Sequence, residues 1–177
     1  MQDTRDFAVV LGDDGSAQDY FAESRAYLAA HGITDVQTTK VQPNGGTVKN
    51  ARNAVRAAAT RWVLMLSPGD FLYDSETLRW WLGRLQADEP RVAFGRQAYF
   101  TPDPPQPTAG ETPFDRTPYD PAHYDAKAIR RNLLLYDDGI SGAGLVYERT
   151  LFLSALDKMA DHVRLAEDFS LRLFAVQ

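Results

Sequence analysis

Short runs of apolar residues end repeatedly at turn-forming residues along this chain. Phe7 to Leu11 is apolar and stops at Gly12-Asp-Asp-Gly-Ser16, and Trp62 to Leu66 stops at Ser67-Pro-Gly-Asp70. A short apolar run that ends at a turn is typical of a buried strand, and fully apolar strands are typical of parallel sheets covered on both faces. Val36 to Val41 is predicted to form a further strand between these two.

Helical patterns of apolar residues separate the predicted strands. The first such pattern follows Ser16, which can cap the helix, and ends at His31-Gly32. The second follows Pro43-Asn-Gly-Gly46, and Asp74 or Ser75 can cap the third. The apolar positions of the three helices are Tyr20, Phe21, Tyr27 and Leu28; Val48, Ala51, Val55 and Ala58; and Leu78, Trp81, Leu82 and Leu85.

The order of these elements indicates an open α/β fold. A strand is predicted from Arg91 to Phe100, then a helix from Asp125 to Tyr136, a strand from Leu145 to Tyr147, and a terminal helix containing Glu167-Asp168. Strands that alternate with helices predict an open, mostly parallel sheet with helices on both faces. We expect one domain over residues 1–177, without internal repeats.

Proline concentrates in one segment of the chain. Seven of the ten prolines lie between residues 101 and 121. This density predicts a long loop without regular structure, and long loops in compact domains are often functional. Three aromatic residues in or near the loop favour its docking against the domain: Phe114, Tyr119 and Tyr124.

Composition then excludes several classes of protein. The 177 residues include no cysteine and three scattered histidines, which argues against disulfide frameworks, zinc clusters and thiol nucleophiles, so a metal would need oxygen ligands. No apolar run reaches the length of a membrane span, and from the polar start MQDTRD we expect no signal peptide. The net charge of −5 argues against nucleic-acid binding. A cytoplasmic location follows as the expectation.

Four motifs in order resemble the family 2 glycosyltransferases. They are Asp13-Asp-Gly-Ser16 after an apolar strand, Asn44-Gly-Gly46 followed by Ala51-Arg-Asn53, the apolar strand that ends in Leu66-Ser-Pro-Gly-Asp70, and the late Glu167-Asp168 pair. The resemblance extends from about Phe7 to the C-terminus. It implies the GT-A fold, an α/β fold that binds nucleotide sugars.

The resemblance also implies an inverting transfer of a sugar from a nucleoside diphosphate donor to a hydroxyl of a carbohydrate or glycolipid acceptor. Asp168 maps to the general base. Asp13 or Asp14 maps to the contact with the nucleotide base, and Arg52 lies near the nucleotide. The candidate nucleotide-binding set is therefore Asp13, Asp14, Gly15, Ser16, Asn44, Gly46 and Arg52.

The sequence departs from the family at the metal site. Members typically carry Asp-x-Asp after this apolar strand, because two carboxylates hold a divalent ion against a diphosphate. Here Ser67 and Gly69 replace the usual carboxylates and Asp70 remains as the one candidate ligand. Asp70 together with diphosphate oxygens would hold Mg²⁺ or Mn²⁺ only weakly, so dependence on metal stays open.

A second departure concerns the start of the chain. In the family the Asp-Asp-Gly-Ser turn follows the second strand, so an opening βα unit of roughly thirty residues is expected to be missing. A reading frame that begins late, a rearranged sheet, or a strand supplied by another chain would each account for it. An unpaired strand edge favours association, so a homodimer is a natural expectation.

Two other interpretations compete with an active enzyme. A non-catalytic relative that serves as a binding or assembly module is favoured by Ser67 and Gly69. An unrelated doubly wound α/β domain could also contain these turns, because Asp-Asp-Gly-Ser is an ordinary strand-to-helix turn and a Glu-Asp pair often begins a helix.

Overall fold

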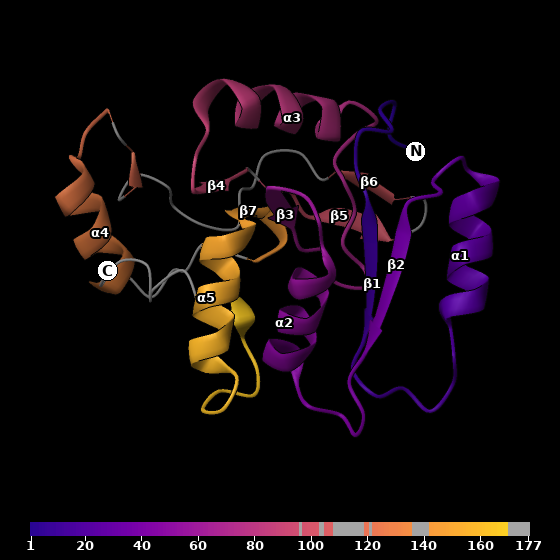
Figure 1. Ribbon diagram of the computed structural model, residues 1–177. Helices are drawn as coiled ribbons and strands as arrows, with labels where there is room; N and C mark the ends of the chain where they lie inside the picture. Colours follow the sequence, from indigo (N-terminus) through magenta and orange to yellow (C-terminus); the bar gives the residue numbers. More distant parts are fainter. Residues whose placement is uncertain (96, 103–104, 108–118, 121, 136–141, 170–177) are drawn as a thin grey trace.

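The computed structural model describes residues 1–95, 97–102, 105–107, 119–120, 122–135 and 142–169, and shows a mixed α/β fold (Figure 1). The strands are β1 (Val9–Asp13), β2 (Val36–Lys40), β3 (Trp62–Leu64), β4 (Val92–Phe94), β5 (Phe100–Pro102), β6 (Pro105–Pro107) and β7 (Leu145–Glu148). The helices are α1 (Phe21–Ala30), α2 (Thr47–Ala57), α3 (Thr77–Asp88), α4 (Ala126–Leu135) and α5 (Arg149–Met159), with the 3-10 turns η2 (Gly142–Gly144) and η3 (Glu167–Phe169).

The first sheet consists of β1 and β2, which are parallel and are joined by α1. The predicted cap of α1 is wrong. Ser16 lies well before the helix, where its N–H donates to Asp13, and the Asp19 carboxylate instead accepts the Phe21 N–H at 2.9 Å. No residue of α1 is buried, and Tyr27 is 63% exposed, so the apolar spacing predicted this helix but not a buried face.

The second sheet has the order β3-β7-β4, and β7 is antiparallel to both neighbours. Only β1 and β2 form a parallel pair among the described strands, so hydrogen bonding does not produce the mostly parallel sheet expected from the alternating pattern. The reason is that β7 returns after a long excursion of the chain through α4. Such a connection can enter a sheet in either direction.

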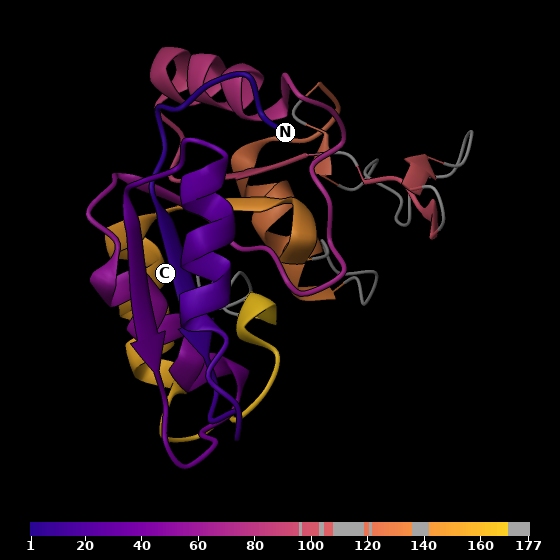
Figure 2. The same cartoon turned by 90° about the vertical axis from the view of Figure 1, so that its right-hand side faces the viewer.

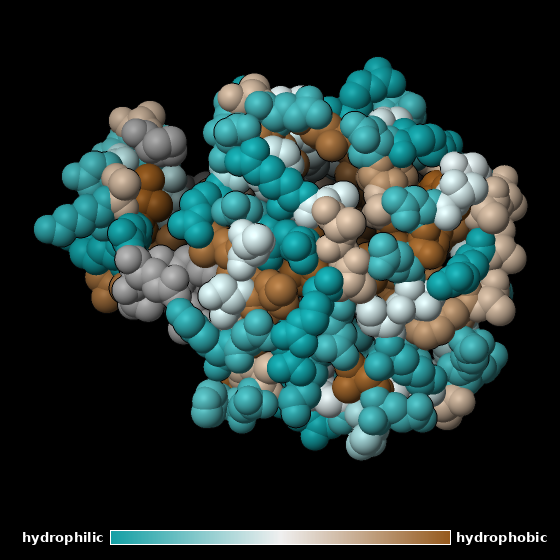
Figure 3. Space-filling view, viewed as in Figure 1, coloured by the Kyte–Doolittle hydropathy of each residue, from teal (hydrophilic) through white to brown (hydrophobic). Residues whose placement is uncertain are grey.

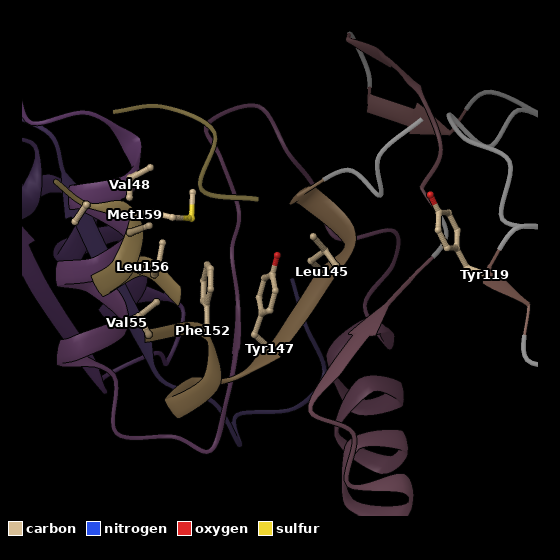
Figure 4. Packing of buried hydrophobic residues seen from close by; sticks show 10 residues of the cluster. Val48, Val55, Tyr119, Leu145, Tyr147, Phe152, Leu156 and Met159 are labelled. Atoms are coloured by element: carbon tan, nitrogen blue, oxygen red, sulfur yellow. The ribbon is translucent and has the colours of Figure 1, made fainter. Parts of the chain in front are cut away.

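The hydrophobic core lies between α2, α5 and β7 (Figure 4). Val48, Ala51 and Val55 form the buried face of α2, as their spacing predicted. Phe152 on α5 stacks on Tyr147 of β7, with ring centroids 4.0 Å apart, and both side chains are almost fully buried. Burial of apolar surface is the dominant favourable term in folding, so this layer is the main source of stability.

The proline-rich segment is not wholly irregular. β5 and β6 pair as an antiparallel hairpin, which Figure 2 shows projecting from the body of the molecule. The expectation of no regular structure across 101–121 is therefore wrong at its start. Proline is tolerated in the strands of a two-stranded ribbon because half of their backbone groups face outward and need no partner. Phe114 lies outside the described residues, whereas Tyr119 is buried against Phe94.

One glycine weakens α3. Gly83 lies inside this helix, is exposed, and has no atom within 4 Å of the position where a Cβ would stand. Gly83→Ala is expected to raise the free energy of unfolding by about 0.5–1 kcal/mol, because alanine loses less backbone entropy in a helix. Urea denaturation measures this gain, and an unchanged or lower midpoint would contradict it.

The surface in Figure 3 is mostly hydrophilic, and its apolar areas are separated from one another. Several large apolar side chains are exposed, including Phe71 and Tyr73 in the segment after β3. Within the described ranges, none of the helices has both the length and the apolar character needed to cross a membrane.

Candidate active site

A cavity of about 240 Å³ opens where β3 ends and β7 begins. Because β7 is antiparallel to β3, its first residues lie beside the last residues of β3. The segment that carries Glu167 and Asp168 closes a third side. Residues from these segments and from α5 line the cavity: Met65, Ser67, Asp70, Gly142, Ala143, Tyr147, Phe152, Glu167 and Asp168.

Asp168, the candidate base, lies close to the start of β7. It belongs to η3. This turn begins directly after Ala166, which has a left-handed backbone with φ of 66°. A Cβ placed on Gly142 would lie 3.2 Å from the Asp168 Cβ and 3.5 Å from its Oδ2. The absence of a side chain at Gly142 therefore lets the Asp168 carboxylate approach the backbone of the cavity wall.

Asp70, the candidate metal ligand, lines the same cavity as Asp168. Its Oδ2 accepts the backbone N–H of Ser67 at 2.9 Å, which closes the turn after β3. Across the residues that the structure describes, no group of three or more His, Cys, Asp or Glu side chains could hold a metal ion. This donor set does not fit an Mg²⁺ or Mn²⁺ site built by the protein alone, since Mg²⁺ needs near-octahedral oxygen coordination.

Most of the candidate nucleotide-binding residues form a second cluster, where β1 and β2 end. Asp13 and Lys40 are cross-strand neighbours, and their side chains form an ion pair of 3.0 Å. Lys40 also donates to the Ser16 carbonyl. Hydrogen bonds from Ser16, first of all from its backbone N–H, together with Lys40 lower the pKa of Asp13 from 3.8 to about 2.

Asp14 binds the next loop. Its Oδ1 accepts the Gly45 N–H at 2.7 Å, and its Oδ2 accepts the Gly46 N–H at 2.9 Å. The Asn44 side chain donates to the Asp14 carbonyl at 2.6 Å. A carboxylate at the start of α2 also interacts favourably with the helix dipole. Gly15 completes the contact, since a Cβ there would stand 2.8 Å from the Asn44 nitrogen.

The lowered pKa of Asp13 makes stability depend on pH. A depressed folded-state pKa contributes stability that is complete above the unfolded value of 3.8 and is lost as the pH falls towards 2. We expect the free energy of unfolding of the wild type to exceed that of Asp13→Asn by a constant margin between pH 5 and 8. Over this range an aspartate carboxyl is ionised in both the folded and the unfolded protein. Urea titrations should show this margin closing below pH 4. A margin that persists down to pH 2 would rule out this linkage.

Arg164 connects the second cluster to the segment of Asp168, and the sequence analysis missed it. Its guanidinium donates to Asn44 Oδ1 at 2.7 Å and to the Asn44 carbonyl at 3.3 Å. Its own carbonyl accepts the Val48 N–H of α2. No sequence signal marked this residue beyond its position three residues before Glu167, because an exposed arginine is usually a solvated charge.

Arg52 belongs to neither group of contacts. It lies half-buried on α2, and its Nε has no hydrogen-bond partner among the described residues. It does not line the cavity of Asp168. The structure thus brings Asp70 and Asp168 to one cavity and gathers Asp13 to Ser16 with Asn44 and Gly46.

Neither a scan against models of protein families nor a search of curated proteins gives a match for this chain.

Proposed function

We propose that this protein transfers a sugar from a nucleoside diphosphate donor to a hydroxyl group of a carbohydrate or glycolipid acceptor. The observation that supports this most is the cavity shared by Asp70 and Asp168. The two residues are nearly a hundred positions apart in the sequence, and both come from motifs of the glycosyltransferase resemblance.

In the proposed reaction, Asp168 is the general base. Its carboxylate takes the proton of the acceptor hydroxyl, whose oxygen forms a bond to the anomeric carbon of the donor. The bond between that carbon and the diphosphate oxygen breaks, and the nucleoside diphosphate leaves with the electron pair. A single displacement of this kind inverts the anomeric configuration. Asp70 lies on the diphosphate side of the cavity in this proposal.

The second cluster is the proposed nucleotide site. Asp13 or Asp14, with Gly15, Ser16, Asn44 and Gly46, would face the nucleotide. The Asp14 carboxylate already accepts the Gly45 and Gly46 N–H groups before α2, so it holds the two loops of this cluster together. Arg52 on the same helix would supply a positive charge.

The finer fold belongs to the same proposal. We assign the two sheets to the two parts of a GT-A-like open sheet. In support, α2 packs against β1, β2 and α5, while α5 packs against β7, so one helical layer serves both sheets. Among the described strands, β1 pairs only with β2, so its other edge is unpaired. We assign this edge to a homodimer contact. We also propose that the protein is cytoplasmic. Sedimentation of a monomer at all concentrations would remove the dimer.

Nucleotide binding tests the function directly. Thermal shift and calorimetry with UDP, GDP and dTDP sugars, each with and without Mn²⁺, should show stabilisation by at least one donor. A donor that binds should also be hydrolysed slowly in the absence of acceptor. If no nucleotide or nucleotide sugar changes the melting temperature, the proposed function is wrong.

A non-catalytic binding module is the second candidate. Ser67 and Gly69, where carboxylates are usual, favour it, as does the lack of a protein-built metal site in the described part of the chain. This alternative also predicts nucleotide-sugar binding. Donor hydrolysis separates the two candidates, because a module without a functional base leaves the bound donor intact.

A further inference from the structure

The charged side chains of the cavity wall are all acidic. Asp70, Glu167 and Asp168 contribute three carboxylates, and the nine lining residues that the structure describes include no lysine, arginine or histidine. Ionised carboxylates only accept hydrogen bonds, so they suit the hydroxyl groups of a sugar. They repel a second anion, because like charges a few ångströms apart in a partly enclosed site are strongly unfavourable.

The other six lining residues carry no charge. Met65, Tyr147 and Phe152 contribute apolar atoms, but Tyr147 and Phe152 are almost fully buried and stack on each other, so they close the cavity and do not offer a free ring face. Mixed walls of this kind are usual in small-molecule sites, where apolar groups carry the contact area and a few polar groups fix orientation. The cavity therefore combines apolar atoms with carboxylates that can accept hydrogen bonds from hydroxyl groups.

The cavity also has the size of one part of a nucleotide sugar. Its volume of about 240 Å³ is below the roughly 300–1,000 Å³ of pockets that hold a whole drug-sized ligand. It is larger than a cavity of about 150 Å³, which accommodates benzene. A single six-membered ring with its hydroxyl groups fits these limits, and the diphosphate would then lie at the edge of the cavity, on the side of Asp70.

We infer that the cavity accepts an uncharged sugar ring and discriminates against sugars that carry a carboxylate, such as uronic acids. This inference rests on the proposed function and specifies its substrate class. The discrimination is a repulsive one: an extra carboxylate would enter a wall that holds three and would meet no cation among the described lining residues.

The test compares two donors that differ in one group. UDP-glucose and UDP-glucuronate share nucleotide, diphosphate and ring, and differ by the carboxylate at C6; GDP-mannose and GDP-mannuronate form the equivalent pair if guanine is preferred. Calorimetry on the full chain should give a dissociation constant at least about tenfold larger for the uronate, which equals about 1.4 kcal/mol. The dissociation constant of the free nucleoside diphosphate, UDP or GDP, is measured in the same experiment.

Two variants tie the discrimination to the cavity. Glu167→Gln removes one negative charge from the cavity wall. The ratio of the two dissociation constants should fall by about threefold or more, which is less than the full cost of one contact between like charges. Glu23→Gln makes the same chemical change on the exposed surface of α1 and should leave the ratio unchanged.

Each result has a defined meaning. Equal binding of the two sugars, or a ratio that Glu167→Gln does not narrow, overturns the inference and leaves the proposed function standing. Equal dissociation constants for UDP and UDP-glucose also overturn the inference, because the sugar ring then contributes nothing to binding. Absence of binding by every nucleotide overturns the proposed function itself.

Discussion

Asp168→Asn is expected to lower sugar transfer and donor hydrolysis by about 10²–10⁴-fold, the usual contribution of a positioned general base. Asparagine has nearly the same shape and fits the space beside Gly142, but it cannot take the proton of the acceptor hydroxyl. Donor binding should survive, because Asp168 supplies one part of a wall formed by nine residues. Release of nucleoside diphosphate, measured at saturating donor, gives the rate.

Asp161→Asn is the matched control for this variant. Asp161 is exposed, lies a few residues earlier in the same segment, and does not line the cavity, so its replacement removes the same charge without touching the site. Its rate should equal that of wild type. Unchanged turnover in Asp168→Asn, with normal donor binding, would exclude Asp168 as the base.

Gly46→Ala is expected to lower the free energy of unfolding by about 2–6 kcal/mol. Gly46 is buried and precedes α2 with φ of 91°, a backbone conformation that costs a non-glycine residue about 1–3 kcal/mol. A Cβ there would stand 3.0 Å from the Arg164 carbonyl carbon, and its oxygen and Cγ would be closer still. Overpacking of this kind adds about 1–3 kcal/mol.

Gly69→Ala separates the two contributions. Gly69 has φ of 97°, almost the same as Gly46, but no atom lies within 4 Å of its Cβ position. It should therefore show backbone strain alone, about 1–3 kcal/mol. Guanidinium denaturation of both variants gives the difference as the contribution of the Arg164 contact. Equal destabilisation would mean that the segment around Arg164 moves aside freely.

The sequence predicted the features that depend on neighbouring residues. The buried face of α2 follows from the spacing of Val48, Ala51 and Val55, and the turn after β3 follows from Ser67-Pro-Gly-Asp70. The exposure of α1 was not predictable, because helical spacing shows that an apolar stripe exists but not that another element covers it.

The candidate site was predictable in its motifs and not in its walls. Asp70 and Asp168 were chosen from sequence, yet their shared cavity depends on the antiparallel entry of β7, which an alternating pattern of strands and helices does not reveal. Tyr147 and Phe152 carried no functional signal because they are ordinary core residues. Arg164 was missed since its partners lie about 120 positions away.

The stacked pair of Tyr147 and Phe152 belongs both to the hydrophobic core and to the wall of the cavity. The size of the cavity and the stability of the fold are therefore coupled. Phe152→Leu would enlarge the cavity only by removing packing from the layer that holds α2, α5 and β7 together. Substitutions at Ser67, which is exposed, and at Ala143, which is small, can change the range of substrates with a smaller loss of stability. Variation during evolution or in a directed library should accumulate at those two positions while the aromatic pair stays fixed.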